Sequence, residues 1–424
     1  MMDGRLVSRD AYLDRALMFR DTDLIKVVTG VRRCGKSSLL ELIRKRFTAE
    51  GIDGRALVSL NLESKACSVA TENDLYAYFR DRLFADGRTY IFLDEPQRVV
   101  GWQNAVNAMR VDFDCDIYLT GSNAYLLSSE LSTYLSGRYV EVNMLPLSVS
   151  EYLDFCGLAF GESSATVGSD GNVVLFDDVL ERYLRFGGMP AIASLTTMQQ
   201  GHSAYLSSLY DAVASRDIVN RERGRGRSKV TDDVLLGKIA AFLGDNVGNK
   251  LSMKGIADAL TSAGSKTTNK TVESYVTALN EAYLFYKADR YDLHGKEILR
   301  TNPKQYVVDL GLRSYLGGYR STDMGRLFEN AVFLQLLYKG WSVHVGKLYE
   351  KEVDFVAIRD GRTVYVQVTD EMFSEATRGR ELGPLRSIRD SYEKVVVVRQ
   401  GRYEADIDGI AIVSAKDFFL GERF

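Results

Sequence analysis

The sequence contains few residues that could bind a structural metal or form disulfide bonds. Its 424 residues include four cysteines and three histidines. The cysteines are widely spaced, no two of them form a CxxC pair, and none follows Cys156. We therefore expect neither a zinc site nor a disulfide framework. Free cysteines fit a reducing cytosol.

Long apolar runs are also absent. No segment reaches the roughly 18 apolar residues that a helix needs to span a bilayer, and the first residues contain no apolar signal-peptide core. The sequence thus predicts a cytoplasmic protein without a membrane span. The formal net charge is −3, which does not indicate a globally basic nucleic-acid-binding protein but is compatible with a local basic patch.

The composition and the length indicate a folded protein of several domains. Hydrophobic residues make up 46% of the chain and charged residues 26%, as is ordinary for globular proteins. A chain of 424 residues is too long for one ordinary hydrophobic core. We therefore expect between two and four domains.

Short apolar runs alternate with longer amphipathic segments between Leu24 and Glu151. The runs are IKVVTG, ALVSLNLE, YIFLDE and DIYLTGS. Nearly continuous apolar runs of this length are typical of parallel strands that are covered on both faces. The segments between them are long enough for crossover helices, so the sequence predicts a doubly wound α/β domain.

A phosphate-binding motif follows the first of these strands. Residues 30–37 read GVRRCGKS, which fits GxxxxGK[ST], and they lie between an apolar strand and a helix, as the motif requires. Backbone N–H groups of such a loop surround phosphate oxygens, and the helix N-terminus adds a positive partial charge. The predicted nucleotide-binding residues are Gly30, Val31, Arg32, Arg33, Cys34, Gly35, Lys36, Ser37 and Ser38. The alternative is a glycine-rich turn that binds nothing.

The residues of this motif have separate expected roles. Lys36 should reach the β- and γ-phosphates of ATP, and Ser37 should ligate Mg²⁺. Two acids end the strand YIFLDE, one crossover after the loop. Asp94 should hold the Mg²⁺ through a water, and Glu95 should polarise the attacking water. A strand that ends in two acids would mean little alone, but its place after a phosphate loop makes the pattern specific.

Two further segments supply candidates for contacting the γ-phosphate. The strand IYLTGSN places Thr120, Ser122 and Asn123 near the same edge of the sheet, and we take Asn123 as the candidate catalytic residue. A plain polar turn is the alternative. Arg138 is a candidate arginine finger that would contact the nucleotide of a neighbouring subunit, with a salt-bridged surface arginine as the alternative.

Taken together, these motifs resemble those of bacterial and archaeal AAA-type ATPases that carry a C-terminal domain of the kind described as DUF4143. The matching segments include VVTGVRRCGKSSLL, YIFLDEPQRV, YLTGSN with LSGRYVEVNMLPLS, LRFGGMP, RDIVNR, and ENAVFLQLLYKGW with EVDFVA and VYVQVT. The resemblance covers most of the chain. It implies an AAA-type ATPase domain followed by two further parts.

The first implied part is a winged-helix module. Helical segments and a hairpin pattern between residues 235 and 310 read as helix–turn–helix with a wing, a shape that can enter a major groove. Lys266, Lys270 and the basic segment 221–229 favour DNA contact, whereas Glu273 and Glu281 oppose it. A helical module that binds protein, or only packs internally, is the alternative.

The second implied part is a C-terminal domain of the restriction-endonuclease-like PD-(D/E)xK fold. A working site of that kind needs a helix glutamate, a strand aspartate and an acid-x-lysine strand to hold Mg²⁺ and activate water. The corresponding residues here form a degenerate set: Glu329, Asp354, Gln367 and Thr369. Because glutamine replaces the second acid and threonine the lysine, we expect an inactive site. Lys347, Lys351 and Asp370 are the residues that could compensate.

The domain prediction has four parts. A P-loop AAA-type ATPase domain covers residues 1–165, and a helical lid or connector covers 166–234. A winged-helix-like domain covers 235–312, and the DUF4143-like domain, with its α/β restriction-endonuclease-like fold, covers 313–424.

The predicted function is hydrolysis of ATP to ADP and phosphate, as a switch or motor that acts on double-stranded DNA or on a protein partner. The resemblance implies ATP rather than GTP, and no guanine-reading NKxD motif follows the third strand. One alternative is an ATP-gated nuclease, and another is a nucleotide-binding scaffold without turnover. A homo-oligomer is compatible with the arginine finger.

Overall fold

The computed structural model describes residues 6–64, 67–121, 135–168, 171–195, 199–219 and 230–421. The chain divides into two compact units. Unit 1 comprises Met1–Leu145 and Glu281–Tyr283, and unit 2 comprises Pro146–Asn280 and Leu284–Phe424. The first predicted boundary, at residue 165, lies beyond the end of unit 1, and the division into four domains stays a prediction.

Unit 1 contains a five-stranded parallel sheet. Its strand order is β2-β3-β4-β1-β5, and every neighbouring pair in it is parallel. The strands are β1 (Ile25–Thr29), β2 (Leu57–Asn61), β3 (Thr89–Asp94), β4 (Cys115–Gly121) and β5 (Tyr139–Asn143). The helices are α1 (Asp10–Leu17), α2 (Lys36–Ala49), α3 (Glu72–Arg80) and α4 (Trp102–Asp112). The predicted doubly wound α/β domain is confirmed.

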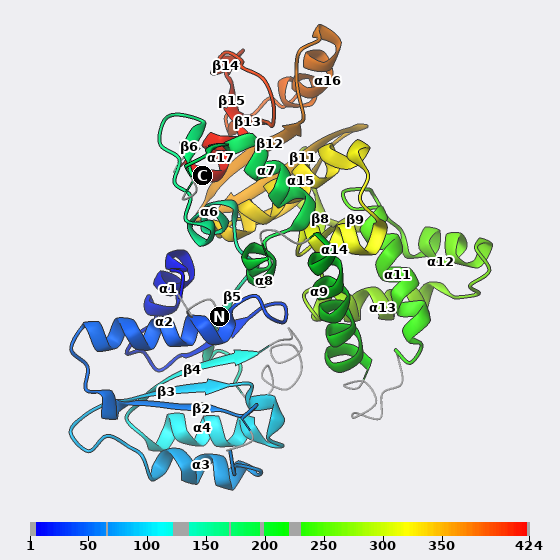
Figure 1. The fold of residues 1–424 in the computed structure, drawn as a ribbon. Coiled ribbons are helices and arrows are strands. Elements are labelled where there is room, and N and C mark those ends of the chain that lie inside the picture. The colour runs from blue at the N-terminus through cyan, green and yellow to red at the C-terminus, as the bar shows by residue number, and fades with distance from the viewer. Residues whose placement is uncertain are drawn as a thin grey trace. The chain divides into compact units, whose positions relative to one another are not determined.

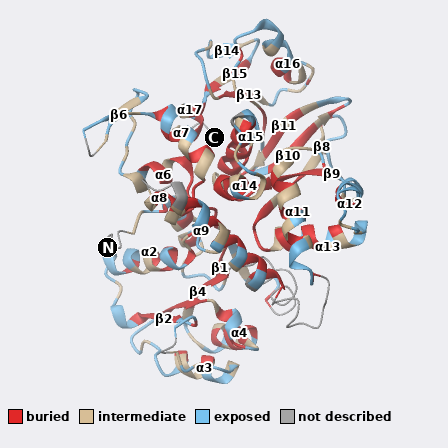
Figure 2. Ribbon diagram, turned by 45° about the vertical axis from the view of Figure 1, so that its right-hand side comes forward, coloured by how far each residue is buried: buried red, intermediate tan, exposed pale blue. Residues whose placement is uncertain are grey.

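Both faces of this sheet are covered by helices, with α1 and α2 on one side and α3 and α4 on the other (Figure 1). Successive residues of β3 alternate between the two layers. Ile91 and Leu93 join the core under α3 and α4, whereas the ring of Phe92 lies 6.2 Å from that of Phe47 on α2. The strands are therefore buried and the outer helix faces exposed (Figure 2).

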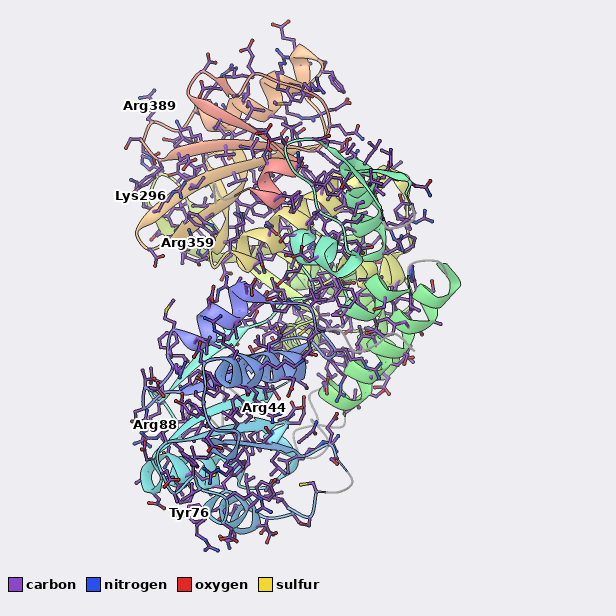
Figure 3. The ribbon with its side chains drawn as sticks, turned by 60° about the vertical axis from the view of Figure 1, so that its left-hand side comes forward. Arg44, Tyr76, Arg88, Lys296, Arg359 and Arg389 are labelled. Carbon is purple, nitrogen blue, oxygen red and sulfur yellow. The ribbon has the colours of Figure 1, made fainter. Side chains whose placement is uncertain are left out.

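The rim of unit 1 is polar. Arg88, labelled in Figure 3, donates from Nε to Asp114 Oδ1 at 2.7 Å. The hydroxyl of Tyr76, also labelled there, donates to Asp112 Oδ2 at 2.8 Å. Exposed pairs of this kind contribute little to stability, so the fold of unit 1 depends on its two apolar layers.

Unit 2 contains an eight-stranded mixed sheet with the order β14-β15-β13-β12-β11-β10-β8-β9. Its strands are β8 (Phe285–Asp292), β9 (Glu297–Val307), β10 (Ser342–Leu348), β11 (Lys351–Arg359), β12 (Arg362–Thr369), β13 (Glu393–Val398), β14 (Asp406–Ile407) and β15 (Ile410–Ser414). The helices near it include α15 (Met324–Tyr338), α16 (Glu375–Arg386) and α17 (Ala415–Leu420). Phe355 on β11 faces Phe333 of α15, while Val356 joins the core that Leu382 of α16 completes.

The remaining elements of unit 2 are mostly helical. They are α6 (Val149–Cys156), the short strands β6 (Ala165–Val167) and β7 (Val173–Leu175), α7 (Phe176–Phe186), α8 (Pro190–Ser194), α9 (Gln199–Ala212), a π-helical turn (Val213–Val219), α11 (Asp233–Asp245), α12 (Met253–Ser262), α13 (Asn269–Glu281) and α14 (Leu310–Gly317). The predicted mixed α/β fold of the C-terminal region is thus confirmed.

The region predicted to be a winged helix has the required order of elements, three helices (α11, α12 and α13) followed by the hairpin β8–β9. The hairpin is not an independent wing, because β8 pairs in parallel with β10. One sheet therefore runs across the predicted boundary at residue 312. The basic segment 221–229 lies outside the described residues, and the winged-helix assignment stays a prediction.

The LRFGGMP segment ends α7 in a tight turn against a buried carboxylate. The N–H of Gly188 donates to Asp309 Oδ2 at 2.7 Å, and the N–H of Leu312 donates to Oδ1 at 3.1 Å. A Cβ at Gly187, whose φ is +82°, would lie 2.2 Å from the same carboxylate. Burial raises the pKa of Asp309 to about 6, although the hydrogen bonds from backbone amides act to lower it. Glycine is therefore required at position 187 for packing.

Within the described part of the chain, no helix is long and apolar enough to cross a membrane.

Candidate functional site

The carboxyl ends of the parallel strands in unit 1 bring the predicted site residues to one edge of the sheet. Asn61, at the end of β2, is paired in register with Asp94 at the end of β3. Leu93 is paired with Leu119 of β4, so Thr120 lies beside Asp94. Strand β1, which leads into the phosphate loop, lies between β4 and β5. Ligands of open α/β sheets bind at such an edge.

The loop that follows β1 has the backbone conformation that its glycines permit. Gly30 has a φ of +139° and Gly35 a φ of +110°, and Arg33 between them has a φ of +64°. A Cβ at Gly30 would lie 2.1 Å from the carbonyl oxygen of Met144. No other residue type therefore fits at position 30. The left-handed backbone at Arg33 is strained, and functional loops often contain such strain.

Lys36 is buried and directed back onto its own loop. Its Nζ donates to the carbonyl oxygens of Gly30 and Val31, each at 3.0 Å. Both partners are neutral carbonyls, so phosphate oxygens could replace them as acceptors. Helix α2 begins at Lys36 without an acidic residue in its first turn, and Ser37 is exposed there. The positive end of the helix is therefore available to an anion.

Asp94 is held by two neutral donors, one on each carboxylate oxygen. Asn61 Nδ2 donates to Oδ2 at 3.1 Å, and the Thr120 hydroxyl donates to Oδ1. These bonds orient the carboxylate and come from uncharged groups. A carboxylate with a fixed direction fits the predicted role of holding Mg²⁺ through a water.

Glu95 has a left-handed backbone, with a φ of +58°. Its N–H donates to the Thr120 hydroxyl oxygen at 3.2 Å, and its carboxylate accepts from the side-chain amide of Gln97. Burial raises the pKa of Glu95 above its ordinary value, while the nearby Lys36 ammonium opposes this shift. A carboxylate with a raised pKa is better suited to accept a proton from water.

Of two further predicted residues, Asn123 and Arg138, the structure describes only Arg138. Asn123, with Ser122, lies outside the described residues. Arg138 directly precedes β5, which begins beside Ile25, the first residue of β1. Arg138 therefore lies at the edge of the sheet opposite the phosphate loop, where its Nη1 donates to Asn107 Oδ1 at 2.9 Å. The structure does not bring it to the loop of its own chain.

The predicted second site, in unit 2, is occupied by a buried ion-pair cluster. Lys304 on β9 lies 3.1 Å from Glu329 Oε1 and 3.0 Å from Glu352 Oε1. The Tyr306 hydroxyl donates to the same Glu329 oxygen at 2.6 Å. Lys304 is only 4% exposed. The cluster thus contains its own cation, supplied by a strand that lies outside the expected motif.

The other two residues of the second site are also bonded internally. The N–H of Val368 donates to Asp354 Oδ2 at 2.8 Å. The side chain of Gln367 accepts from the Asp354 N–H at 3.3 Å and donates to Glu381 Oε2 at 3.0 Å. Burial, together with the neighbouring Glu329 carboxylate, raises the pKa of Asp354 well above its ordinary value. Asp354 and Gln367 are thus both engaged by partners within unit 2.

Two of the three residues suggested as compensation, Lys351 and Asp370, have partners elsewhere. Lys351 donates to Ser387 Oγ at 2.6 Å, and Asp370 is paired with Arg399. Across the residues that the structure describes, no group of three or more histidines, cysteines, aspartates or glutamates is arranged to hold a metal ion.

The sequence analysis missed several residues that the structure places at these sites. Asn61 could have been found, because it ends a predicted strand as Asp94 does. Arg9 and Tyr12 contact the region of the phosphate loop from a helix far upstream, and Lys304 reaches its cluster through strand pairing. No local pattern identifies these three.

Comparison with known proteins assigns the N-terminal part. Residues 22–153 match the family described as "AAA domain". Residues 177–323 match a family described as "Domain of unknown function (DUF8612)". DUF4143, which the sequence resemblance named, is not the family found there, so that part of the resemblance stays a prediction.

Two relatives match almost the whole chain. An uncharacterized protein of Haemophilus influenzae is 38% identical over 421 residues, which cover 99% of this chain and 100% of the relative. An uncharacterized protein of Methanocaldococcus jannaschii, MJ1544, is 27% identical and covers 93% of this chain and 87% of its own length. Among solved structures, the Walker-type ATPase PABY2304 of Pyrococcus abyssi aligns with a TM-score of 0.43 at 16% identity, over 73% of this chain and 95% of that one. The chain therefore belongs to the same protein family as the Haemophilus influenzae protein, and its residues 22–153 match the AAA domain family.

Proposed function

We propose that this protein binds ATP with Mg²⁺ at the phosphate loop of unit 1 and hydrolyses it to ADP and phosphate. The observation that supports this proposal best is the shared edge of the sheet. Lys36, Asp94 and Glu95 lie there together, and Thr120 bonds to both acids. A plain glycine-rich turn would need neither the strained Glu95 nor the two donors on Asp94.

Each residue has a definite task in this proposal. Lys36 exchanges its loop carbonyls for the β- and γ-phosphate oxygens, and Ser37 with Asp94 holds the Mg²⁺ that neutralises phosphate charge. Glu95 orients the attacking water and accepts its proton. Asn61 and Thr120 keep the Asp94 carboxylate in place. Catalysis of phosphoryl transfer depends mainly on this kind of positioning and charge stabilisation.

The proposed output of the ATPase is a switch or motor action, in the cytoplasm, on double-stranded DNA or a protein. The helices α11 to α13 and the hairpin β8–β9 offer a winged-helix-like surface for such a partner. Lys266 and Lys270 are exposed on it, next to the exposed Glu273. This mixture of charges supports a partner without deciding which kind.

An ATPase assay with and without duplex DNA tests the proposal. We expect phosphate release that requires Mg²⁺, that Lys36→Ala removes and that Glu95→Gln slows. Stimulation by DNA would favour a DNA partner over a protein partner. Binding of ATP with no release of phosphate under any of these conditions would instead show a nucleotide-binding scaffold.

The position of Arg138 sets a condition on its proposed role as an arginine finger. Because it lies at the edge opposite the phosphate loop, it can act only on the nucleotide of another copy of the chain. The proposed homo-oligomer and the proposed role of Arg138 therefore depend on each other.

A further inference from the structure

Arg9, directly before α1, makes a bridge that the proposed chemistry does not use. Its Nη1 donates to the carbonyl oxygen of Cys34, inside the phosphate loop, at 3.1 Å. Its Nη2 donates to the carbonyl oxygen of Leu145 at 2.8 Å. The side chain is only 4% exposed. One guanidinium thus joins the phosphate loop to the last residue of unit 1.

The segment Met144–Leu145 is bonded at all four of its backbone polar groups. The Met144 N–H donates to the Thr29 carbonyl at 2.8 Å, and the Cys34 thiol donates to the Met144 carbonyl at 3.4 Å. The Leu145 N–H donates to the Tyr12 hydroxyl at 3.1 Å, and the Leu145 carbonyl accepts from Arg9 Nη2. Every partner comes from the phosphate loop, from the strand before it, or from the Arg9–Tyr12 segment.

The bond to Cys34 has a direct consequence for phosphate binding. A trans peptide unit is planar, and its C=O and N–H point in opposite directions. Because Arg9 holds the Cys34 carbonyl, the N–H of Gly35 is directed away from Arg9. Gly35 has no Cβ and a φ of +110°, so its peptide could otherwise rotate with little steric resistance. Arg9 removes that freedom.

We propose that Arg9 is a positioning residue for nucleotide binding, which fixes the Cys34–Gly35 peptide and ties the phosphate loop to the exit segment Met144–Leu145. This inference rests on the proposed nucleotide binding at Lys36. Because coupling between two sites is reciprocal, nucleotide that orders the loop also orders the exit segment. Leu145 is the residue from which the chain continues into unit 2. The order of this segment therefore depends on whether nucleotide is bound to unit 1.

The test compares Arg9→Gln with Arg15→Gln, a matched change on the same segment. The guanidinium of Arg15 lies over the Tyr12 ring, 5.3 Å from its centroid. The hydrogen bond to the Cys34 carbonyl of the phosphate loop is made by Arg9. Calorimetric titration with Mg·ATP should show a Kd raised about tenfold or more in Arg9→Gln, the scale for losing hydrogen bonds from a charged donor. Arg15→Gln should stay within about threefold. Arg9→Lys, which keeps the charge but replaces the forked guanidinium with a single nitrogen on a shorter side chain, should lie between Arg9→Gln and wild type.

Amide hydrogen exchange gives a second readout, and its first measurement uses the wild-type protein alone. Saturating Mg·ATP should slow exchange at Leu145, and Arg9→Gln should abolish the slowing while its melting temperature stays near that of wild type. A wild-type Kd in folded Arg9→Gln, or unchanged Leu145 exchange when nucleotide protects the loop amides, would overturn the inference. If Arg9→Gln does not fold, Arg9→Lys and the wild-type exchange decide the question. Failure of wild type itself to bind nucleotide would overturn the proposed function instead.

Discussion

The cluster around Lys36 and the cluster around Lys304 each combine carboxylates with a buried lysine, and they differ in what the lysine contacts. In unit 1, Lys36 is bonded to loop carbonyls, and Asp94 accepts hydrogen bonds from neutral side chains. In unit 2, Lys304 lies between Glu329 and Glu352. The first arrangement leaves both signs of charge available to a ligand. The second neutralises them internally.

This comparison shows that residue type does not decide whether a cluster is reactive. Neutral partners can be exchanged for phosphate or metal at small cost, because no charge is left unpaired. Separating a buried ion pair leaves an uncompensated charge, which costs several kcal/mol. The unit 1 cluster is therefore organised for ligand exchange, and the unit 2 cluster for stability.

The largest effect is expected from removing the exchangeable lysine. Lys36→Ala should weaken Mg·ATP binding by a factor on the order of a thousand, ~4 kcal/mol, because it removes the one charge directed at the β- and γ-phosphates. A fluorescent ATP analogue measures the affinity. Lys45→Ala, an exposed lysine on the same helix, is the control. Wild-type affinity in Lys36→Ala would show that the loop is not a nucleotide site.

Removing Lys304, which is paired with two carboxylates, should affect stability instead. Lys304→Met should lower the unfolding free energy of unit 2 by about 3–5 kcal/mol, because Glu329 and Glu352 lose a buried partner. The fluorescence of Trp341 reports on this unit, and Arg359, labelled in Figure 3, lies over its ring at 4.5 Å. A Trp102→Phe background removes the signal from unit 1.

The control for Lys304→Met is Lys287→Met, which removes a lysine from the surface of the same sheet. Lys287 is 3.0 Å from Asp289 and about half exposed. It should change stability by less than about 1 kcal/mol. Equal effects of the two substitutions would mean that the Lys304 cluster is not a buried ion-pair network.

The third effect is on turnover. Glu95→Gln should keep ATP bound but slow hydrolysis by about a hundredfold, the scale for losing a positioned base. Since burial raises the pKa of Glu95, kcat/KM of wild type should fall with decreasing pH from above the ordinary glutamate value of about 4.3. Asp94→Asn should instead weaken the Mg²⁺ dependence of binding. Undiminished turnover in Glu95→Gln would place the base elsewhere.

A smaller effect is expected at Asp354. Its pKa is raised in the fold, so its contribution to stability is full below the unfolded value of about 3.9 and is lost as pH rises through the folded pKa. Asp354→Asn imitates the neutral carboxyl and should change stability by less than about 1.5 kcal/mol at pH 5. Measured by denaturant unfolding, the unfolding free energy of the variant relative to that of wild type should rise between pH 5 and pH 8. A deficit that stays constant over that interval would show that Asp354 is ionised in the fold.

No effect at all is expected in a nuclease assay. Wild type should not cleave linear, supercoiled or branched DNA at millimolar Mg²⁺ or Mn²⁺, because Lys304 neutralises Glu329 and Gln367 is bonded to Glu381. Asp354→Ala should leave ATP hydrolysis largely intact as long as unit 2 stays folded. Cleavage by wild type that disappears in Asp354→Ala while ATP binding survives would establish the ATP-gated nuclease instead.

The sequence predicted the parts of this structure that depend on local patterns. The apolar runs became β1 to β4 of the parallel sheet, and the phosphate loop with Asp94 and Glu95 follows from motif spacing. The Lys304 cluster could not be predicted, because its members meet through the pairing of β8 with β9 and of β10 with β11. The Arg9 bridge joins residues 136 positions apart. Such contacts are properties of register and packing, which a single sequence does not display.

The position of Arg138 also limits the symmetry of any assembly that uses it as an arginine finger. The donor surface and the acceptor surface are opposite edges of one sheet, so the two patches of an interface cannot be the same patch. A two-fold dimer with a self-complementary interface is then excluded. The contact has to be heterologous, head to tail, and repeats of it close into a ring or continue as a helical filament. In either case, an isolated chain would lack the arginine that completes its own catalytic apparatus.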